Sequence, residues 1–404
     1  MNKTKVLVVD DSKVQRNHVI ELCRQQGVIN IESAENGQVA LDMLTANQFD
    51  LVFIDLEMPV MDGVELVSQI AERKLVGAVI ILSSKDPSLI LSIGTMAESD
   101  GLSVVGTFQK PMKEEDLTIS LNRMTNDFVK VSKKIVNEEL TKEDLLQAMD
   151  NREITLYYQP KLTVKGLLLK GVEALSRWHH PERGMISPVQ FIDAAERFGV
   201  ISQLTEYLFD IALHEKKQWQ ERGLNFHLSF NLSPLSLADT QLAEQIFKQV
   251  ERFNIAPKDI VLEITENALS GEVSKAIQTL ATLRLKGFNL AIDDYGTGFA
   301  NAQQLSRVPS TELKLDRILV DNVSTNPHQQ AILKSTVALS KDLQLTTVAE
   351  GVEYLDDYKF IYQLDVDLVQ GYYFAKPMAP SDLIDWIKYE LGEHRKAIQR
   401  ELSS

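Results

Sequence analysis

Acidic residues follow short apolar runs near the N-terminus, in a pattern that could hold a divalent cation. Asp10 and Asp11 follow the run Val6–Val9. Asp55 follows the run Leu51–Ile54. Because the carboxyl ends of adjacent parallel strands meet at one edge of a sheet, we expect these three carboxylates to converge. Carboxylates so close together repel one another unless a hard cation is bound, so the pattern predicts a Mg²⁺ site.

Two further polar residues end apolar runs of the same region. Ser83 follows Ala78–Leu82, and Lys110 comes shortly after Val104–Phe108. A hydroxyl and an ammonium group at the same sheet edge could bind the oxygens of a transferred phosphoryl group. Asp55 would then be the nucleophile that forms an aspartyl phosphate. Any one of these acidic residues could instead be a helix cap, so the joint pattern carries the hypothesis.

A second set of polar residues ends the apolar runs of the later sequence. Its members are Glu173, Asn231, Glu263, Asp293, Asp294, Lys314, Glu350 and Gln370. Carboxylates with one amide suit Mg²⁺ or Mn²⁺. The adjacent Asp293-Asp294 pair predicts two neighbouring ions, a pattern that activates a water and stabilises the leaving oxygen of a phosphodiester. Lys314 could orient that water, and the forked guanidinium of Arg177 could bind a phosphate.

The elements that must position the first set are short strands alternating with helical segments. The runs are Val6–Val9, Ile29–Ser33, Leu51–Ile54, Ala78–Leu82 and Val104–Phe108. Continuous apolar strands separated by helical lengths are typical of a parallel sheet covered on both faces. We therefore expect an α/β, doubly wound, flavodoxin-like domain whose ligands bind at the strand ends.

Eight strand-like runs follow in the later sequence. They are Ile154–Gln159, Leu167–Leu175, Phe226–Asn231, Ile260–Ile264, Phe288–Ile292, Glu312–Leu315, Leu345–Ala349 and Asp367–Gly371. Helical segments separate most of them, which favours a modified (β/α)8 TIM barrel with its site at the carboxyl face. Only Pro160–Gly166 separates the first two, which is too short for a parallel crossover and predicts one antiparallel strand.

The domain boundaries follow from these patterns. Apolar residues recur every three or four positions after Lys113, which predicts a helical connector, and Thr141 with Asp144 forms the pattern of a capping box that opens a new helix. The expected division is residues 1–124 as the first domain, 125–140 as a helical linker, 141–392 as the barrel and 393–404 as a C-terminal tail.

Composition excludes several classes of protein. Hydrophobic residues make up 44% and the net charge is −15, so the chain is globular and has no broad basic face for DNA. Cys23 is the only cysteine, which excludes an internal disulfide and a cysteine zinc site. No apolar stretch is long enough to span a membrane, and the N-terminal run is too short for a signal peptide. We expect a cytoplasmic protein, and a tail after residue 392 too short for a DNA-binding module.

The N-terminal segment resembles the receiver domain of two-component response regulators. The matching motifs are Val-Val-Asp10-Asp11, Asp55-Leu-Glu-Met-Pro59-Val-Met-Asp-Gly63, Ser83 and Lys110-Pro111. The resemblance implies a Mg²⁺ ion at Asp10, Asp11 and Asp55, and phosphorylation of Asp55 by a histidine kinase or phosphotransfer protein. Thr107 stands three residues before the lysine, where receivers usually carry an aromatic switch residue. The usual aromatic coupling is therefore not expected here.

The later sequence resembles the EAL family of cyclic di-GMP phosphodiesterases. The matching motifs are Tyr158-Gln159-Pro160, Glu173-Ala174-Leu175-Ser-Arg177-Trp, Asn231-Leu-Ser-Pro, Glu263-Ile-Thr-Glu266, Asp293-Asp294-Tyr-Gly-Thr-Gly, Lys314-Leu-Asp316, Ala-Glu350-Gly-Val-Glu353 and Gln370-Gly-Tyr-Tyr. The resemblance implies hydrolysis of cyclic di-GMP to linear pGpG at two Mg²⁺ or Mn²⁺ ions. Family members often form homo-oligomers, dimers or larger, through their barrels.

The resemblance also implies a role for each matched residue. The metal ligands are Glu173, Asn231, Glu263, Asp293, Asp294 and Glu350. Lys314 matches the water-orienting lysine, and Glu350 is either a general base or a ligand of the second ion, so the catalytic residues are Glu173, Lys314 and Glu350. Gln159, Arg177 and Gln370 are the expected substrate contacts. Glu266 matches the glutamate that steadies the loop after the Asp-Asp pair.

Two functions fit these residues. One is a phosphorylation-regulated phosphodiesterase, and the other is a catalytically weak receptor that binds cyclic di-GMP. No matched position of the ring is lost, which favours the enzyme. No Gly-Gly-Asp/Glu-Glu-Phe motif occurs, so we do not expect synthesis of the nucleotide. The sequence leaves open which kinase acts on Asp55 and whether phosphorylation raises or lowers activity.

Overall fold

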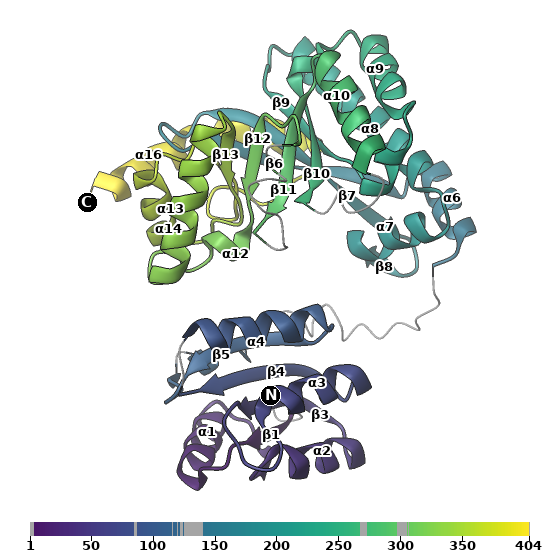
Figure 1. Ribbon diagram of the computed structural model, residues 1–404. Helices are drawn as coiled ribbons and strands as arrows, with labels where there is room; N and C mark the ends of the chain where they lie inside the picture. The colour runs from purple at the N-terminus through teal and green to yellow at the C-terminus, as the bar shows by residue number, and fades with distance from the viewer. Residues whose placement is uncertain are drawn as a thin grey trace. The chain divides into compact units, whose positions relative to one another are not determined.

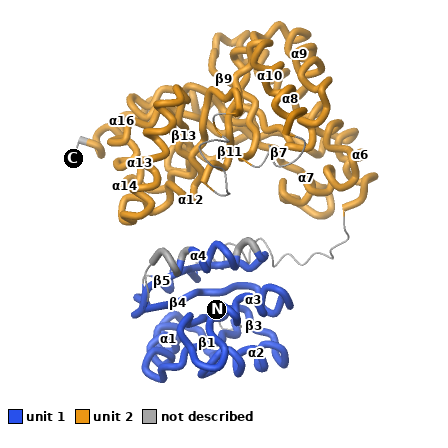
Figure 2. Tube along the Cα trace, viewed as in Figure 1, with its two compact units in different colours: residues 1–137 blue, residues 138–404 orange. Residues whose placement is uncertain are grey.

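The chain folds into two compact units, residues 1–137 and 138–404 (Figure 2). The structure is a computed structural model. It describes residues 4–84, 87–114, 116–118, 120–121, 124, 140–266, 273–296, 305 and 307–403. The expected linker, residues 125–140, lies outside the described residues except for its last position. Among the described residues, no helix is long and apolar enough to span a membrane.

The first unit is a five-stranded parallel sheet with strand order β2-β1-β3-β4-β5 (Figure 1). Its elements are β1 (Lys5–Val9), α1 (Lys13–Gln25), β2 (Asn30–Ala34), α2 (Gly37–Ala46), β3 (Phe49–Asp55), α3 (Gly63–Arg73), β4 (Val76–Ser83), α4 (Pro87–Ser99) and β5 (Ser103–Gln109). This order confirms the flavodoxin-like prediction. Strand order reverses next to β1, which is where such folds bind their ligands.

Side chains of β1 alternate between two hydrophobic clusters, one on each face of the sheet. Leu7 and Val9 pack in the cluster that includes residues of α2, α3 and α4. Val6 and Val8 pack in the other, with α1. Because successive side chains of a strand point to opposite faces, a continuous apolar run is needed when both faces are covered. The two central strands, β1 and β3, end next to Asp10 and at Asp55, so both carboxylates lie at the carboxyl edge of the sheet.

The second unit is a closed barrel of eight strands with one further strand at its rim. Its strands are β6 (Ile154–Thr163), β7 (Leu169–His180), β8 (Gly184–Ile186), β9 (His227–Asn231), β10 (Ile260–Thr265), β11 (Asn289–Tyr295), β12 (Glu312–Leu315), β13 (Thr346–Ala349) and β14 (Leu368–Val369). The order is β6-β14-β13-β12-β11-β10-β9-β7-β8, and the pairing of β6 with β7 closes the barrel. Strand β6 runs antiparallel to both neighbours, which confirms the predicted antiparallel strand.

Helices surround the barrel between its strands (Figure 1). They are α6 (Lys142–Asp150), α7 (Pro188–Arg197), α8 (Ile201–Glu221), α9 (Leu242–Arg252), α10 (Val273–Leu285), α12 (Arg317–Val320), α13 (Pro327–Asp342), α14 (Leu355–Gln363), α15 (Pro380–Asp385) and α16 (Leu391–Ser403). Single-turn segments are Pro234–Ala238, Pro257–Asp259 and Trp386–Glu390. Helix α6 begins with the predicted capping box, in which Thr141 and Asp144 each bond the other's backbone N–H.

Two features of the second unit were not expected. Strand β8 pairs with the end of β7, and its short run, Gly184–Ile186, carried no strand signal in the sequence. The segment predicted as a C-terminal tail is helical through Ser403 as part of α16. This helix packs on the barrel, because Ile398 is buried in the barrel's hydrophobic cluster and Tyr373 donates a hydrogen bond to Glu401.

Candidate functional site

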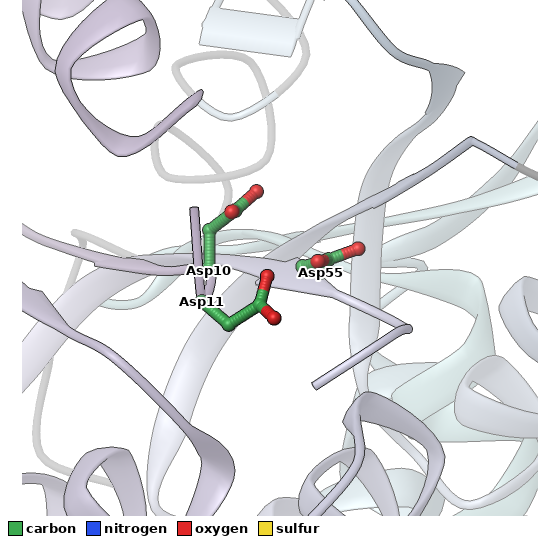
Figure 3. Close-up of side chains that lie close together, drawn as sticks. All are labelled: Asp10, Asp11 and Asp55. Atoms are coloured by element: carbon green, nitrogen blue, oxygen red, sulfur yellow. The ribbon is translucent and has the colours of Figure 1, made fainter. Parts of the chain in front are cut away.

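The predicted carboxylates of the first unit converge at the strand ends. One oxygen of each of Asp10, Asp11 and Asp55 lies within 4.8 Å of the others, and Figure 3 shows the three side chains together. Asp10 and Asp55 are buried, whereas Asp11 is exposed. Gly63 lets α3 begin against this edge, because a Cβ atom there would lie 2.1 Å from the carbonyl oxygen of Asp55.

Lys110 connects two of these carboxylates. Its Nζ lies 2.5 Å from Asp10 Oδ2 and 2.8 Å from Asp55 Oδ2. Burial raises the pKa of Asp55, while the ammonium group of Lys110 pulls in the opposite direction. The remaining Asp55 oxygen, Oδ1, accepts a hydrogen bond from the Glu57 backbone N–H, at 3.2 Å. A buried aspartate held by one lysine beside an exposed aspartate is suited to receive a phosphoryl group next to a cation.

The predicted Ser83, and Thr107 at the position where the sequence departs from the receiver pattern, lie on neighbouring strands of the same sheet. Ser83 is fully buried and ends β4, beside the central strand that carries Asp55. Thr107 lies on β5 against helix α4, where a Cβ atom added to Gly94 would come within 2.8 Å of the threonine methyl group. The helix therefore packs closely on the position where an aromatic switch residue is usual.

In the second unit, Lys314 lies at the centre of the predicted acidic ring. Its Nζ is 2.6 Å from Glu263 Oε2, 2.9 Å from Asp293 Oδ1 and 2.9 Å from Glu350 Oε1. A longer contact, 3.4 Å, joins it to Glu173 Oε1. These residues come from β7, β10, β11, β12 and the loop after β13, so the barrel strands bring together positions far apart in the sequence.

The carboxylates of the ring form two groups that could each hold a metal ion. Glu173, Glu263 and Asp293 form the first, and Asp293, Asp294 and Glu350 form the second. In each group, one oxygen per residue lies within 4.8 Å of the others. Asp293 belongs to both groups, so it is the residue able to bridge two ions. All donors are carboxylate oxygens, which are the ligands that Mg²⁺ and Mn²⁺ prefer.

Three amide side chains support the ring: Asn231 and Gln370 bond Glu173, and Gln159 bonds Gln370. Asn231 Nδ2 donates to Glu173 Oε1 at 3.0 Å, which leaves the Asn231 carbonyl oxygen as its possible metal ligand. Gln370 Nε2 donates to Glu173 Oε2 at 2.6 Å and to Gln159 Oε1 at 3.0 Å. Gln159 in turn donates to the carbonyl oxygen of Ala375. Gln370, expected as a substrate contact, therefore also orients Glu173, and Gln159, likewise expected as a substrate contact, supports Gln370.

Burial and charge give the ring carboxylates unequal pKa values. Burial raises the pKa of Glu173, and raises that of Glu350 well above its ordinary value. Burial and the neighbouring Asp293 raise the pKa of Asp294 to about 6. Burial would also raise the pKa of Glu263, but Lys314 and Lys161 outweigh it and lower the value to about 2. Glu263 is thus the carboxylate whose charge the protein compensates most fully.

The remaining predicted residues lie around the ring. Glu266 Oε2 accepts a hydrogen bond from the Gly296 backbone N–H at 3.0 Å, at the start of the segment that follows Asp294. Residues 297–304 of that segment lie outside the described residues. Arg177 is half-buried on β7, two residues after Leu175, and its guanidinium carbon lies 5.7 Å from the centre of the Tyr157 ring.

Sequence reasoning missed a second buried lysine beneath the ring. Lys161 Nζ contacts Glu263 Oε1 at 3.1 Å and Glu312 Oε1 at 2.9 Å, and it donates to Ser229 Oγ. The other ring residues were predicted from polar positions at the carboxyl ends of apolar runs, whereas Lys161 lies inside β6. A usable signal existed, since alternation along a strand places Lys161 on the same face as Gln159.

Together, the fold and the two sites define a receiver-like α/β domain joined to a barrel that carries a ring of acidic residues. Sequence comparison agrees with this class. The family model for the response regulator receiver domain matches residues 6–122, and that for the EAL domain matches residues 142–377. The chain belongs to the EAL family, in the arrangement that carries an N-terminal receiver domain.

Individual relatives match this chain to different extents. The chain is 32% identical to the cyclic di-GMP phosphodiesterase RocR of Pseudomonas aeruginosa over 388 residues, covering 96% of this chain and 99% of that protein. It is 34% identical to the bifunctional diguanylate cyclase/cyclic di-GMP phosphodiesterase MucR of the same species, covering 60% of this chain and 35% of the relative. A solved structure of a MucR phosphodiesterase complex with c-di-GMP has a TM-score of 0.57, with 34% identity, and covers 60% of this chain and 98% of that one.

Proposed function

We propose that this protein is a response regulator whose barrel hydrolyses cyclic di-GMP to linear pGpG, under the control of phosphorylation at Asp55. The observation that carries the proposal is the complete acidic ring around Lys314, with its two carboxylate groups sharing Asp293. Support comes from the similarity to RocR over nearly the whole chain. We also propose a cytoplasmic location, as for other targets of phosphotransfer.

The donor set fits two Mg²⁺ or Mn²⁺ ions. Glu173, Glu263 and Asp293, with the Asn231 carbonyl oxygen, would hold one, while Asp293, Asp294 and Glu350 would hold the other. Such ions, when bound, supply a nucleophile at neutral pH and stabilise the leaving oxygen of a phosphodiester. The grouping of Glu350 with the Asp pair favours a ligand role for this residue over that of general base.

The chain's own residues would orient the reacting groups. Lys314 is positioned to orient the attacking water, since its Nζ lies among carboxylates of both groups. Arg177 would bind a phosphate of the nucleotide through its guanidinium. Gln159 and Gln370 would fix Glu173 and contact the nucleotide at the same edge. Glu266 would hold the segment after Asp294 through Gly296.

The test is to incubate the purified chain with cyclic di-GMP and Mg²⁺ and to separate the products by ion-exchange chromatography. We expect pGpG to accumulate in Mg²⁺ or Mn²⁺. Ca²⁺ should inhibit, because this larger ion takes more ligands at longer distances. Tight binding of cyclic di-GMP with no pGpG formed would contradict hydrolysis and identify a nucleotide receptor instead. Equal rates in Ca²⁺ and Mg²⁺ would contradict the proposed site.

The receiver supplies the regulatory part of the proposal. Its buried Asp55, paired with Lys110, would accept a phosphoryl group beside a Mg²⁺ ion held with Asp10 and Asp11. The phosphodonor would be a histidine kinase or phosphotransfer protein. We further propose a homo-oligomer formed through the barrel, which light scattering of the purified chain would test, and no DNA partner.

A further inference from the structure

A layer of buried polar and charged side chains lies beneath the acidic ring, inside the barrel. Its members are Lys161 on β6, Ser229 on β9 and Glu312 on β12. The Lys161 side chain is 2% exposed and that of Glu312 is 9% exposed. No nucleotide in the ring above could reach a lysine so deeply buried, so any influence of Lys161 on the reaction must pass through another side chain.

Glu263 is that side chain, because it joins the two layers. Its Oε2 faces Lys314 at 2.6 Å, and its Oε1 faces Lys161 at 3.1 Å. The carboxylate itself has no exposed surface. Placing an ionised carboxylate where water cannot reach it costs several kcal/mol unless cations and hydrogen bonds compensate. One lysine meets each oxygen, and this arrangement fixes the rotation of the carboxylate as well as its charge.

We propose that Lys161 is a positioning residue for the metal site: it holds Glu263 Oε1 so that Oε2 is turned toward Glu173 and Asp293. The idea rests on the proposed phosphodiesterase function, in which Glu263 is a metal ligand. Ser229 and Glu312 fix the ammonium group from its other sides, so Lys161 has one orientation available. Partners behind a ligand commonly change metal affinity or activity tenfold to a hundredfold when removed.

The competing explanation is that Lys161 serves Glu312 alone, as a buried structural pair. Three variants separate the two explanations: Lys161→Met, Glu312→Gln, and the double variant that removes both charges. Methionine keeps the length of the lysine stem without the ammonium group. The double variant leaves neither charge of that pair unmatched, so a purely structural role predicts that it behaves like the wild type. Positioning predicts that it stays defective, because the ammonium group of Lys161 is no longer beside Glu263 Oε1.

The measurement is Mn²⁺ binding, followed by electron paramagnetic resonance of free Mn²⁺ without nucleotide. All proteins carry Asp11→Asn, which weakens the receiver's own cation site so that the titration reports on the barrel. We expect Mn²⁺ affinity to fall about tenfold to a hundredfold in Lys161→Met and in the double variant. The unfolding midpoint of the double variant should return toward that of the wild type. Glu312→Gln alone should retain the affinity, because Lys161 still faces Glu263.

A matched control is Lys216→Met. Lys216 is also a buried lysine, but it lies on α8 and donates to the carbonyl oxygen of Phe226, away from the ring. This variant should bind Mn²⁺ normally even if it is less stable. Wild-type Mn²⁺ affinity in the folded double variant would overturn the proposal. If Lys161→Met and the double variant lose Mn²⁺ affinity as expected, but the protein leaves cyclic di-GMP intact, the proposed function is overturned and the positioning role stands.

Discussion

The two acidic sites of this protein lie at equivalent places in their folds, but they differ in how their charges are balanced. Both lie where parallel strands end, so a sheet edge gathers carboxylates from distant parts of the sequence. In the receiver, one lysine contacts two of three aspartates, and the third aspartate is exposed. In the barrel, Lys314 contacts four carboxylates, and Lys161 supports one of them from below.

This difference matches the chemistry proposed for each site. An aspartate that must accept a phosphoryl group needs few fixed partners, and Asp55 is held by Lys110 and the Glu57 backbone N–H. A site that cleaves a phosphodiester needs its ligands held before substrate arrives, because preorganised charge costs no rearrangement during the reaction. The Asn231 and Gln370 amides that bond Glu173, and the two lysines that contact Glu263, hold the barrel's ligands in this way. Removing parts of each site should therefore have unequal effects.

The largest effect is expected from Glu173→Gln, which removes the charge of a ring ligand while keeping its size. We expect cyclic di-GMP hydrolysis to fall roughly a thousandfold, about 4 kcal/mol of barrier. Stability should change little, because burial raises the pKa of Glu173 and its charge is unfavourable in the folded barrel. Product chromatography and thermal unfolding measure the two quantities.

A control for this variant is Glu153→Gln. Glu153 is half-buried and accepts a hydrogen bond from Nε1 of Trp178, a residue on β7 like Glu173. This variant therefore tests the loss of a carboxylate outside the ring. Turnover of Glu153→Gln should match that of the wild type. Hydrolysis by Glu173→Gln at the wild-type rate in Mg²⁺ would refute the metal assignment of the barrel.

A smaller effect is expected from Gln370→Ala, which loosens the ring without removing a ligand. Gln370 bonds both Glu173 and Gln159, so its loss should lower kcat about tenfold, as for other groups that orient a ligand. Steady-state kinetics separate this effect from substrate binding. A rise in KM with unchanged kcat would show that Gln370 contacts the nucleotide and does not matter for the orientation of Glu173.

The receiver should have a smaller effect on turnover than either barrel change. Beryllofluoride, which mimics a phosphoryl group, should change the rate about fivefold, which corresponds to about 1 kcal/mol, the lower end of typical coupling between sites. Asp55→Asn should abolish that change and keep the basal rate. Asp42→Asn, an exposed aspartate on α2, is the control and should keep the response. An unchanged wild-type rate with the mimic bound at Asp55 would end the proposal of regulation.

Which residues the sequence could reveal depended on the direction of their strands. Asp10, Asp55, Glu263 and Asp293 lie at or within two residues of the carboxyl ends of parallel strands, so one rule located them all. Lys161 escaped that rule because β6 is antiparallel, and residues after Gln159 run deeper into the barrel. The hydrogen bonds that hold Glu173 were also beyond the sequence. Gln370 was identified, but its contact with Glu173 depends on the closure of the barrel, in which β6 pairs with both β14 and β7.

The smallest expected effect is the pH dependence of the barrel's stability without divalent cations. Burial and Asp293 raise the pKa of Asp294 to about 6, so between about pH 4 and 6 the folded state keeps a proton that the unfolded state has lost. Stability from this group is therefore complete at low pH and is lost as the pH rises through 6, by about 1 kcal/mol after allowance for solvent screening.

Asp294→Asn should remove this part of the dependence, which urea denaturation in EDTA at about pH 4.5 and 7.5 would measure. Burial also raises the pKa values of Glu173 and Glu350, so the variant keeps a shallower slope of the same sign, and the difference between the two slopes reports Asp294. Asp356→Asn, an exposed position on α14, should match the wild type. Because a bound cation offsets the repulsion between Asp293 and Asp294, saturating Mg²⁺ should flatten the wild-type curve. Equal slopes in wild type and Asp294→Asn would mean that Asp294 is ionised throughout this range, and the second carboxylate group would then hold its charge without a cation.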